Sequence, residues 1–180
     1  GSKSAQWDGP HPANFCPAFF EELVASIRRI VSEVKPQKTF YTLEPMPFMP
    51  PDTPESYLEL LQAVDMKGFA VHADIVNILS SPRLFYDNAA LTERFFRLLG
   101  PYYIASCHIK DLALGNGLTV HLSEVPMGQG GLDVAAYLRC VAALEERTTV
   151  VLEHQASAEA YRTGAEHLRA VAKANSIFMK

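Results

Sequence analysis

With 180 residues, 48% of them apolar, and charges of both signs, the chain is expected to form one globular domain over residues 1–180, which excludes extensive disorder. Its net charge of −4 and the lack of a Lys/Arg cluster exclude a nucleic-acid partner, because phosphate binding requires clustered cations. Three cysteines without a CxxC pair exclude a disulfide framework and favour a cytoplasmic protein, and no apolar run of about eighteen residues predicts a membrane span.

The first predicted element is an amphipathic helix over residues 17–34, where apolar side chains recur at helical spacing. Lys35 and Pro36 end this helix, because the residue before a proline avoids the α region. The apolar run KTFYTLE, residues 38–44, then predicts a strand. After a proline-rich loop, Thr53 can cap a second helix, so the order of elements is helix, strand, loop and helix.

Short apolar runs and helical patterns alternate along the rest of the chain. Continuous apolar runs are typical of strands buried on both faces, and strands that alternate with helices indicate parallel βαβ units. The sequence therefore predicts an α/β fold with a parallel sheet. The further predicted strands are GFAVHAD, YIASCHIKD and TTVVLEH, followed by helices near residues 88–99, 133–146 and 157–174.

A long excursion separates YIASCHIKD from the next helix. It contains the alternating segment LTVHL and a Gly-Asn-Gly turn, which together predict a small hairpin. Its GQGG motif follows Pro-Met instead of a core strand and lacks the G-x-G-x-x-G spacing. The motif therefore predicts a tight turn before a helix capped by Asp133, and not a phosphate-binding loop.

Each of the four predicted strands finishes in a residue that can bind a metal ion: Glu44, Asp74, His108 and Glu153. The carboxyl ends of parallel strands meet at one mouth of the fold, where α/β proteins place their active sites. Three carboxylates gathered there repel one another without a cation. The pattern therefore predicts a divalent metal site. Oxygen ligands with one imidazole suit a hard or borderline ion, so we expect Mn²⁺, with Mg²⁺, Co²⁺ and Zn²⁺ as alternatives.

These motifs resemble those of the sugar phosphate isomerase/epimerase family of xylose isomerase-like TIM barrels. The resemblance rests on TLEPMP, VHADIVN, SCHIKD and VLEH in the family's order, with WDGPHPANF and GQGGLD, and covers nearly the whole chain. It implies that the four strand-end residues are the metal ligands of barrel strands four, five, six or seven, and eight. A complete (β/α)8 barrel has eight strands and about 250 residues. The chain is therefore expected to be the C-terminal part of an incomplete barrel, about strands 4 to 8 with their helices.

The resemblance also implies a function, that of a divalent-metal-dependent sugar isomerase or epimerase. One of Glu44 and Glu153 would remove a proton next to a substrate carbonyl and the other would return one, through a metal-stabilised enediolate. An unphosphorylated sugar or polyol is the expected substrate. Ketose 3-epimerases tend to carry a histidine where this chain has Asn77, which can bind a hydroxyl but cannot act as an acid. The candidate substrate-binding residues are Asn77, Lys110, Asp111, His72 and Trp7.

Several alternatives stay open. A dehydratase or lyase acting on keto-sugars, including the carbon-glycoside-cleaving type, would use the same metal site, whereas a non-catalytic subunit would not need it. For Lys110 and Asp111, a surface ion pair is an equal alternative to substrate binding. For His72, support of the metal ligands or core packing is favoured over substrate binding. The missing strands would come from a longer chain, from a partner chain or from a second copy in a homo-oligomer.

Overall fold

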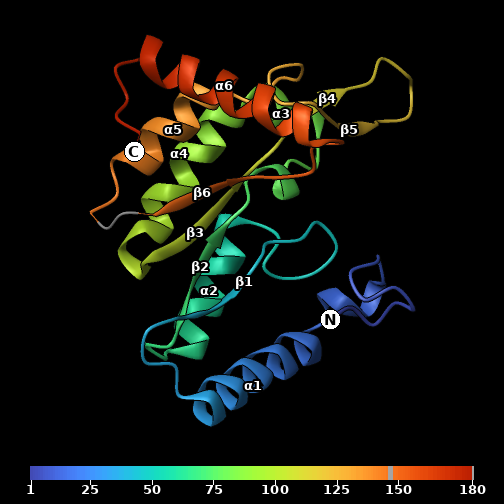
Figure 1. Cartoon of the computed structure of the whole chain (residues 1–180). Coiled ribbons are helices and arrows are strands. Elements are labelled where there is room, and N and C mark those ends of the chain that lie inside the picture. Colours follow the sequence, from blue (N-terminus) through green and yellow to red (C-terminus); the bar gives the residue numbers. More distant parts are fainter. Residues whose placement is uncertain (146–147, 180) are drawn as a thin grey trace.

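The computed structural model describes residues 1–145 and 148–179, and a parallel sheet runs through its centre (Figure 1). All three strand pairings in this sheet are parallel, and the strands stand side by side in their chain order. The predicted α/β fold with a parallel sheet is confirmed. The sheet strands are β1 (Tyr41–Leu43), β2 (Phe69–Ala73), β3 (Ile104–Ile109) and β6 (Thr149–Leu152).

The helices follow the start and stop signals of the sequence. Helix α1 (Pro17–Val34) is followed by its C-cap residue Lys35, which adopts a left-handed backbone with a φ of 50° just before Pro36. Thr53 and Ser56 form a reciprocal capping box at the start of α2. The α-helices of the described residues are α1 (Pro17–Val34), α2 (Pro54–Val64), α3 (Pro82–Tyr86), α4 (Asn88–Leu99), α5 (Val134–Ala142) and α6 (Ala158–Ala174). None of them is long and apolar enough to cross a lipid bilayer.

Helix α5 is shorter than the range of residues 133–146 predicted for it. Asp133 caps the helix as expected, since its side chain accepts a hydrogen bond from the helix backbone. The helix ends at Ala142, and the N–H of the next residue, Ala143, bonds back to the carbonyl oxygens of Arg139 and Cys140 in the last turn. Residue 146, at the end of the predicted range, lies outside the described residues.

The excursion after β3 folds into the predicted hairpin, although its strands are not centred on LTVHL. Strand β4 (Asp111–Leu114) pairs in antiparallel fashion with β5 (Leu122–Val125), apart from the parallel sheet. Strands β3 and β6 therefore pair with each other directly. The described residues thus contribute four strands to the barrel-like sheet, and no barrel strand separates the strand of His108 from that of Glu153.

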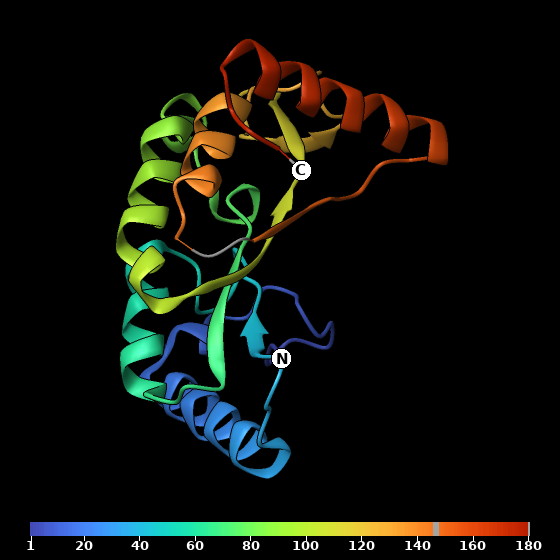
Figure 2. The ribbon, with the colours of Figure 1, turned by 60° about the vertical axis from the view of Figure 1, so that its left-hand side comes forward.

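The two faces of the sheet have different surroundings. Figure 2 shows α2, α4 and α5 stacked along one side of the strands. Strand alternation sends Val71, Cys107 and Ile109 into the core under these helices, where each is at most 1% exposed. On the other face, Val151 is 44% exposed. This open inner face is the one that a closed barrel would enclose.

Candidate metal centre

Four parallel strands bring their C-terminal residues to the same end of the sheet. Glu44, Asp74 and Glu153 directly follow β1, β2 and β6, and His108 is the penultimate residue of β3. The N–H of Glu153 donates to the carbonyl oxygen of Ile109, which fixes the end of β6 beside that of β3. We call Glu44, Asp74, His108 and Glu153 the strand-end cluster.

The strand-end cluster has the dimensions of a cation site. One potential ligand atom from each of its residues lies within 4.8 Å of the other three. Nδ1 of His108 lies 3.1 Å from Oε1 of Glu153, 3.7 Å from Oε1 of Glu44 and 3.9 Å from Oδ2 of Asp74. The side chain of Asp74 is almost completely buried, and the other three are partly open to solvent. The predicted residues therefore converge at one accessible mouth.

Lys110 places its ammonium group against the same carboxylates. Nζ lies 2.8 Å from Oδ2 of Asp74, 2.8 Å from Oε2 of Glu153 and 3.9 Å from Oε1 of Glu44. The side chain is only 2% exposed, so the alternative of a surface ion pair is wrong for this residue. One ammonium faces three carboxylates, which leaves an excess of negative charge for a divalent ion to balance.

These contacts shift the pKa values of the charged side chains at the mouth in different directions. Burial raises the pKa of Glu44, and neighbouring Asp74 raises it further. Burial would raise the pKa of Glu153 too, but Lys110 and His108 outweigh it and the pKa is lowered. Burial would lower the pKa of Lys110, but Asp74 and Glu153 outweigh it and the pKa is raised. Lys110 is therefore an ammonium at neutral pH.

Buried atoms without partners indicate that a metal ion fits the mouth. Oδ2 of Asp74 and Nδ1 of His108 are buried and accept no hydrogen bond from the residues that the structure describes. Lys110 is close to that Asp74 oxygen, but the contact lacks hydrogen-bond geometry and is an ion pair only. An unsatisfied buried polar atom costs about 1–3 kcal/mol. Both atoms are metal-ligand types, so the residues present fit a divalent ion with oxygen ligands and one imidazole.

Asn77 supports two members of the cluster. Its Nδ2 donates to Oε1 of Glu44 over 2.8 Å, and its backbone N–H donates to Oδ1 of Asp74 over 3.3 Å. The side chain thus orients Glu44, and its Nδ2 also donates to Sδ of Met46 over 3.9 Å. Asn77 therefore lies beside the mouth, and its contact with a substrate stays a prediction.

His72 lies beside the cluster, on the same face as Asp74. Its ring packs edge-on against the ring of His108, with the two centroids 4.1 Å apart, and its Nδ1 lies 2.6 Å from Oγ of Ser106. Burial and the neighbouring His108 lower the pKa of His72 to about 4. His72 is therefore a neutral imidazole at physiological pH.

Asp111 is buried beneath the glycine turn, and not at the surface. Its two carboxylate oxygens accept hydrogen bonds of 2.9–3.1 Å from four backbone N–H groups. A Cβ added to Gly130 would stand 2.2 Å from a carboxylate oxygen of Asp111, so the turn requires glycine at this position. Asp111 therefore holds the turn next to Lys110. Its donors are the N–H groups of Leu112, Gly128, Gly130 and Leu132.

The hairpin contributes Glu124 to the edge of the mouth. One oxygen of Glu124 lies 2.7 Å from Nδ1 of His154, and the other lies 3.7 Å from Nζ of Lys110. The contact with His154 connects the hairpin to the residue after Glu153.

Trp7 is not part of the cluster. It lies in the N-terminal loop and is 72% exposed. This loop is tied to the loop after β1 by Asn14, whose Nδ2 donates to the carbonyl oxygen of Phe48 over 2.9 Å. Figure 1 shows the two loops side by side. The structure therefore does not place Trp7 among the charged residues of the mouth.

Sequence reasoning missed three residues that support the site. Ser106 is revealed by the alternation in SCHIK, since residues two apart in a strand share a face with His108. Tyr57 of α2 and Tyr137 of α5 gave no comparable signal. Their hydroxyl groups donate to the carbonyl oxygens of Leu43 and His108, so two helices hold the strand ends.

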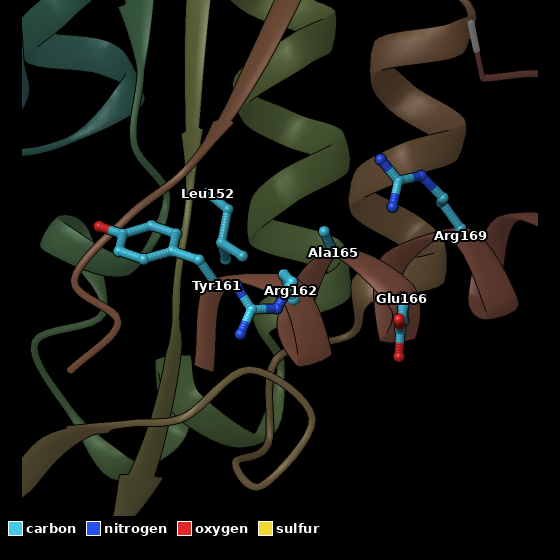
Figure 3. Close-up of a pocket in the computed structure, with 6 residues that line it drawn as sticks. All are labelled: Leu152, Tyr161, Arg162, Ala165, Glu166 and Arg169. Atoms are coloured by element: carbon cyan, nitrogen blue, oxygen red, sulfur yellow. The ribbon is translucent and has the colours of Figure 1, made fainter. Parts of the chain in front are cut away.

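A separate hollow of about 560 Å³ lies between the end of β6 and α6 (Figure 3). It contains no residue of the strand-end cluster, so it does not belong to the candidate metal centre. In a closed barrel, a following βα unit would pack near this position. The residues that line the hollow are Leu152, Tyr161, Arg162, Ala165, Glu166 and Arg169.

The family model described as xylose isomerase-like TIM barrel matches residues 3–171 of this chain. The match covers most of the sequence, and the chain therefore belongs to this family. The open parallel sheet, with helices stacked along one side, is an incomplete form of that barrel. Comparison with curated proteins gives no significant match.

Solved structures of the same fold are similar to this chain at low sequence identity. A xylose isomerase-like TIM barrel protein from Mycobacterium smegmatis in complex with magnesium matches with a TM-score of 0.67 and 15% identity, over 89% of this chain and 52% of its own. The probable 3-DHS dehydratase AsbF from Bacillus anthracis matches with a TM-score of 0.66 and 21% identity, over 89% of this chain and 59% of its own. A D-tagatose 3-epimerase-like protein matches with a TM-score of 0.60 and 18% identity, over 87% of this chain and 54% of its own. The chain thus spans little more than half the length of these structures.

Proposed function

We propose that this member of the xylose isomerase-like TIM barrel family is a divalent-metal-dependent enzyme that isomerises or epimerises a sugar or polyol. The convergence of the strand-end cluster within 4.8 Å, with buried ligand atoms that accept no hydrogen bond from the described residues, carries the proposal. The proposed ligands are all four members of the cluster. Mn²⁺ is the expected ion, and Mg²⁺, Co²⁺ or Zn²⁺ are alternatives.

The proposed reaction is removal of a proton from the carbon next to a carbonyl group. When bound, the ion would supply Lewis-acid polarisation of that carbonyl, which makes the neighbouring C–H acidic. One of Glu44 and Glu153 takes the proton, and the C–H electron pair becomes the double bond of an enediolate. The other glutamate returns a proton to carbon, and the electron pair of the enediolate oxygen restores a carbonyl.

Other residues near the mouth are proposed to hold the substrate. Lys110 keeps its ammonium charge and can donate to the oxygen that becomes negative. Asn77 donates one amide hydrogen to Glu44, and a substrate hydroxyl group would replace the weak sulfur acceptor of Met46 at the other. His72 and Trp7 are the further proposed substrate contacts. Asp111 is proposed to act by holding the turn beside Lys110.

We propose further that residues 1–180 form one domain, the C-terminal part of a barrel. The remaining strands would come from other residues of a longer protein, from a partner chain or from a second copy. Two observations support the proposal: the matched structures are covered to 52–59% of their length, and the inner face of the sheet is open at Val151.

A dehydratase or lyase acting on a keto-sugar is the second candidate. It starts with the same proton abstraction, after which a hydroxyl group or another substituent leaves from the adjacent carbon with its bonding electron pair. Lys110 favours this candidate, because an ammonium next to the reacting carboxylates can protonate a leaving oxygen. Asn77, which cannot act as an acid, leaves that role to the lysine.

Exchange of substrate hydrogen with solvent tests the proposal. The protein is incubated with Mn²⁺ and a panel of keto-sugars in deuterium oxide, and NMR follows the carbon next to the carbonyl. We expect deuterium to enter there, and Glu153→Gln to slow exchange by at least about 100-fold. Glu166→Gln on the outer surface of α6 is the matched control. Full exchange in Glu153→Gln would contradict the proposed chemistry, and an eliminated product would identify the second candidate.

A further inference from the structure

His72 presents an unpaired nitrogen to the mouth. Its side chain is 8% exposed, and its Nε2 is buried without a hydrogen-bond partner among residues 1–145 and 148–179. A buried polar atom without a partner costs about 1–3 kcal/mol. A group that the described chain does not supply is therefore expected to contact this nitrogen.

Ser106 fixes the ring so that Nε2 is the free atom. A register shift between β2 and β3 places Ser106 opposite His72, and its Oγ lies 2.6 Å from Nδ1. We assign the ring proton to Nδ1, which then donates to Oγ of Ser106 and leaves a lone pair on Nε2. A histidine that donates from one nitrogen to an oxygen and keeps a lone pair on the other has the arrangement of a metal ligand.

Glu44 and His108 complete a ligand set with this histidine. One potential ligand atom from each of Glu44, His72 and His108 lies within 4.8 Å of the other two. We call these three residues the second ligand set. Two imidazole nitrogens and one carboxylate oxygen suit borderline ions such as Zn²⁺, Co²⁺ and Cu²⁺, whereas the oxygen-rich strand-end cluster also suits hard ions.

Lys110 distinguishes the two sets electrostatically. Its ammonium lies 2.8 Å from both Asp74 and Glu153, the two carboxylates that the second ligand set does not include. Its distance to Glu44 is 3.9 Å. An ion held by the whole strand-end cluster must therefore compete with the ammonium for two ligands. An ion held by the second ligand set competes with the ammonium only for Glu44, the most distant of the three carboxylates.

We propose that the mouth contains a second position for a divalent ion, held by Glu44, His72 and His108. An ion occupies this position while Lys110 stays paired with Asp74 and Glu153, and borderline ions prefer it. The two positions share Glu44 and His108, so the mouth holds one ion at a time. The inference deepens the proposed function and rests on the same mouth of the sheet.

Counting imidazole ligands on a bound ion tests the second position. The wild-type chain is loaded with one equivalent of Cu²⁺, and electron spin echo envelope modulation reports the number of coordinated imidazoles. The second ligand set predicts two, from His72 and His108, whereas the strand-end cluster alone predicts one. A count of one, or no bound Cu²⁺, would overturn the proposal.

Variants assign the second imidazole. His72→Phe fills the space of the ring without a ligand atom and is expected to reduce the count to one, whereas His121→Phe, in the hairpin, leaves it at two. Glu153→Gln is expected to bind Cu²⁺ with an affinity within about threefold of wild type, because the second ligand set lacks Glu153. Two imidazoles in His72→Phe would overturn the proposal. The proposed reaction is tested separately, by Mn²⁺-dependent proton exchange. That test can give a negative result even if two imidazoles are counted on Cu²⁺.

Discussion

Lys110 carries the positive charge nearest to the carboxylates of the mouth. Two unit charges about 4 Å apart interact by roughly 4 kcal/mol at the effective dielectric constant of a protein surface. An ammonium at 2.8 Å from Asp74 and Glu153 therefore stabilises the protein without metal and opposes an incoming cation. Lys110 therefore affects the equilibrium between the metal-free and the metal-bound site.

Replacement of Lys110 by methionine tests this balance. We expect Lys110→Met to tighten Mn²⁺ binding by at least about tenfold, because the competing ammonium is removed from two ligands. The same change lowers the stability of the metal-free chain, since the buried carboxylates lose their cation. Calorimetric titration with Mn²⁺ measures the first effect and urea unfolding the second. Unchanged Mn²⁺ affinity would show that Lys110 does not compete.

The hydrogen bonds of Asp111 are expected to stabilise the protein whether or not a metal ion is bound. Its carboxylate accepts four backbone hydrogen bonds, and bonds to a charged group contribute about 1.5–3 kcal/mol each in favourable cases. We expect Asp111→Ala to lower the free energy of unfolding by roughly 2–4 kcal/mol. The matched control is Asp133→Ala, which removes one helix cap and costs about 1 kcal/mol. Equal losses in the two variants would contradict the anchoring role of Asp111.

The helices act on the site through buried tyrosines. The hydroxyl group of Tyr57 donates to the carbonyl oxygen of Leu43 and accepts from the N–H of His72, where β1 ends beside β2. Tyr137 of α5 bonds to the carbonyl oxygen of His108. Strand ends that carry the strand-end cluster are therefore fixed by helix residues on the far side of the sheet.

Tyr57→Phe tests this support. The variant removes the hydroxyl group that bonds to the carbonyl oxygen of Leu43 and to the buried N–H of His72, and we expect a loss of about 1–3 kcal/mol in the free energy of unfolding at pH 7. Burial raises the pKa of Tyr57, so the unfolded chain loses its proton first as the pH rises above the ordinary value of about 10. The stability therefore falls with rising pH in that range.

Urea unfolding of the two proteins between pH 7 and pH 11 checks both expectations. The stability of Tyr57→Phe is expected to fall less steeply at alkaline pH, because one tyrosine with a raised pKa is absent. Tyr137, whose pKa is also raised, continues to contribute. An identical decline in both proteins would show that Tyr57 ionises equally in the folded and unfolded chains.

Much of the element order could be predicted because its signals are local. Lys35-Pro36, the cap at Thr53 and the apolar runs place the helix and strand limits, and parallel strands necessarily bring Glu44 and Glu153 to one end. The burial of Lys110 could not be predicted, because it depends on the pairing of three strands. The contacts of Ser106 with His72 likewise follow from a register shift that no single strand encodes.

The molecule as a whole exposes surfaces that a closed barrel would cover. Within the part of the chain that the structure describes, β1 and β6 each have one neighbour in the sheet, and Val151 of the inner face is 44% exposed. Open strand edges and apolar inner faces promote association. A protein of this architecture is expected to be stable only when other strands or another copy cover these surfaces.

Light scattering of the 180-residue chain tests this expectation. We predict species larger than the 19.9 kDa monomer. Val151→Lys is expected to weaken association by about tenfold, equivalent to about 1.4 kcal/mol, because a charge on the inner face must be desolvated. Leu118→Lys, at a fully exposed position in the hairpin, is the matched control. A monodisperse wild-type monomer would contradict the prediction.

Metal content is the most direct test of the central proposal that the four strand ends form a metal centre. The chain and three variants are purified with Mn²⁺ present, and elemental analysis gives the ions bound per chain. We predict about one ion per wild-type chain, a loss of that ion in Glu44→Gln and His108→Ala, and retention in the control Glu166→Gln. A folded wild-type chain without metal, or an equal metal content in the cluster variants, would contradict it.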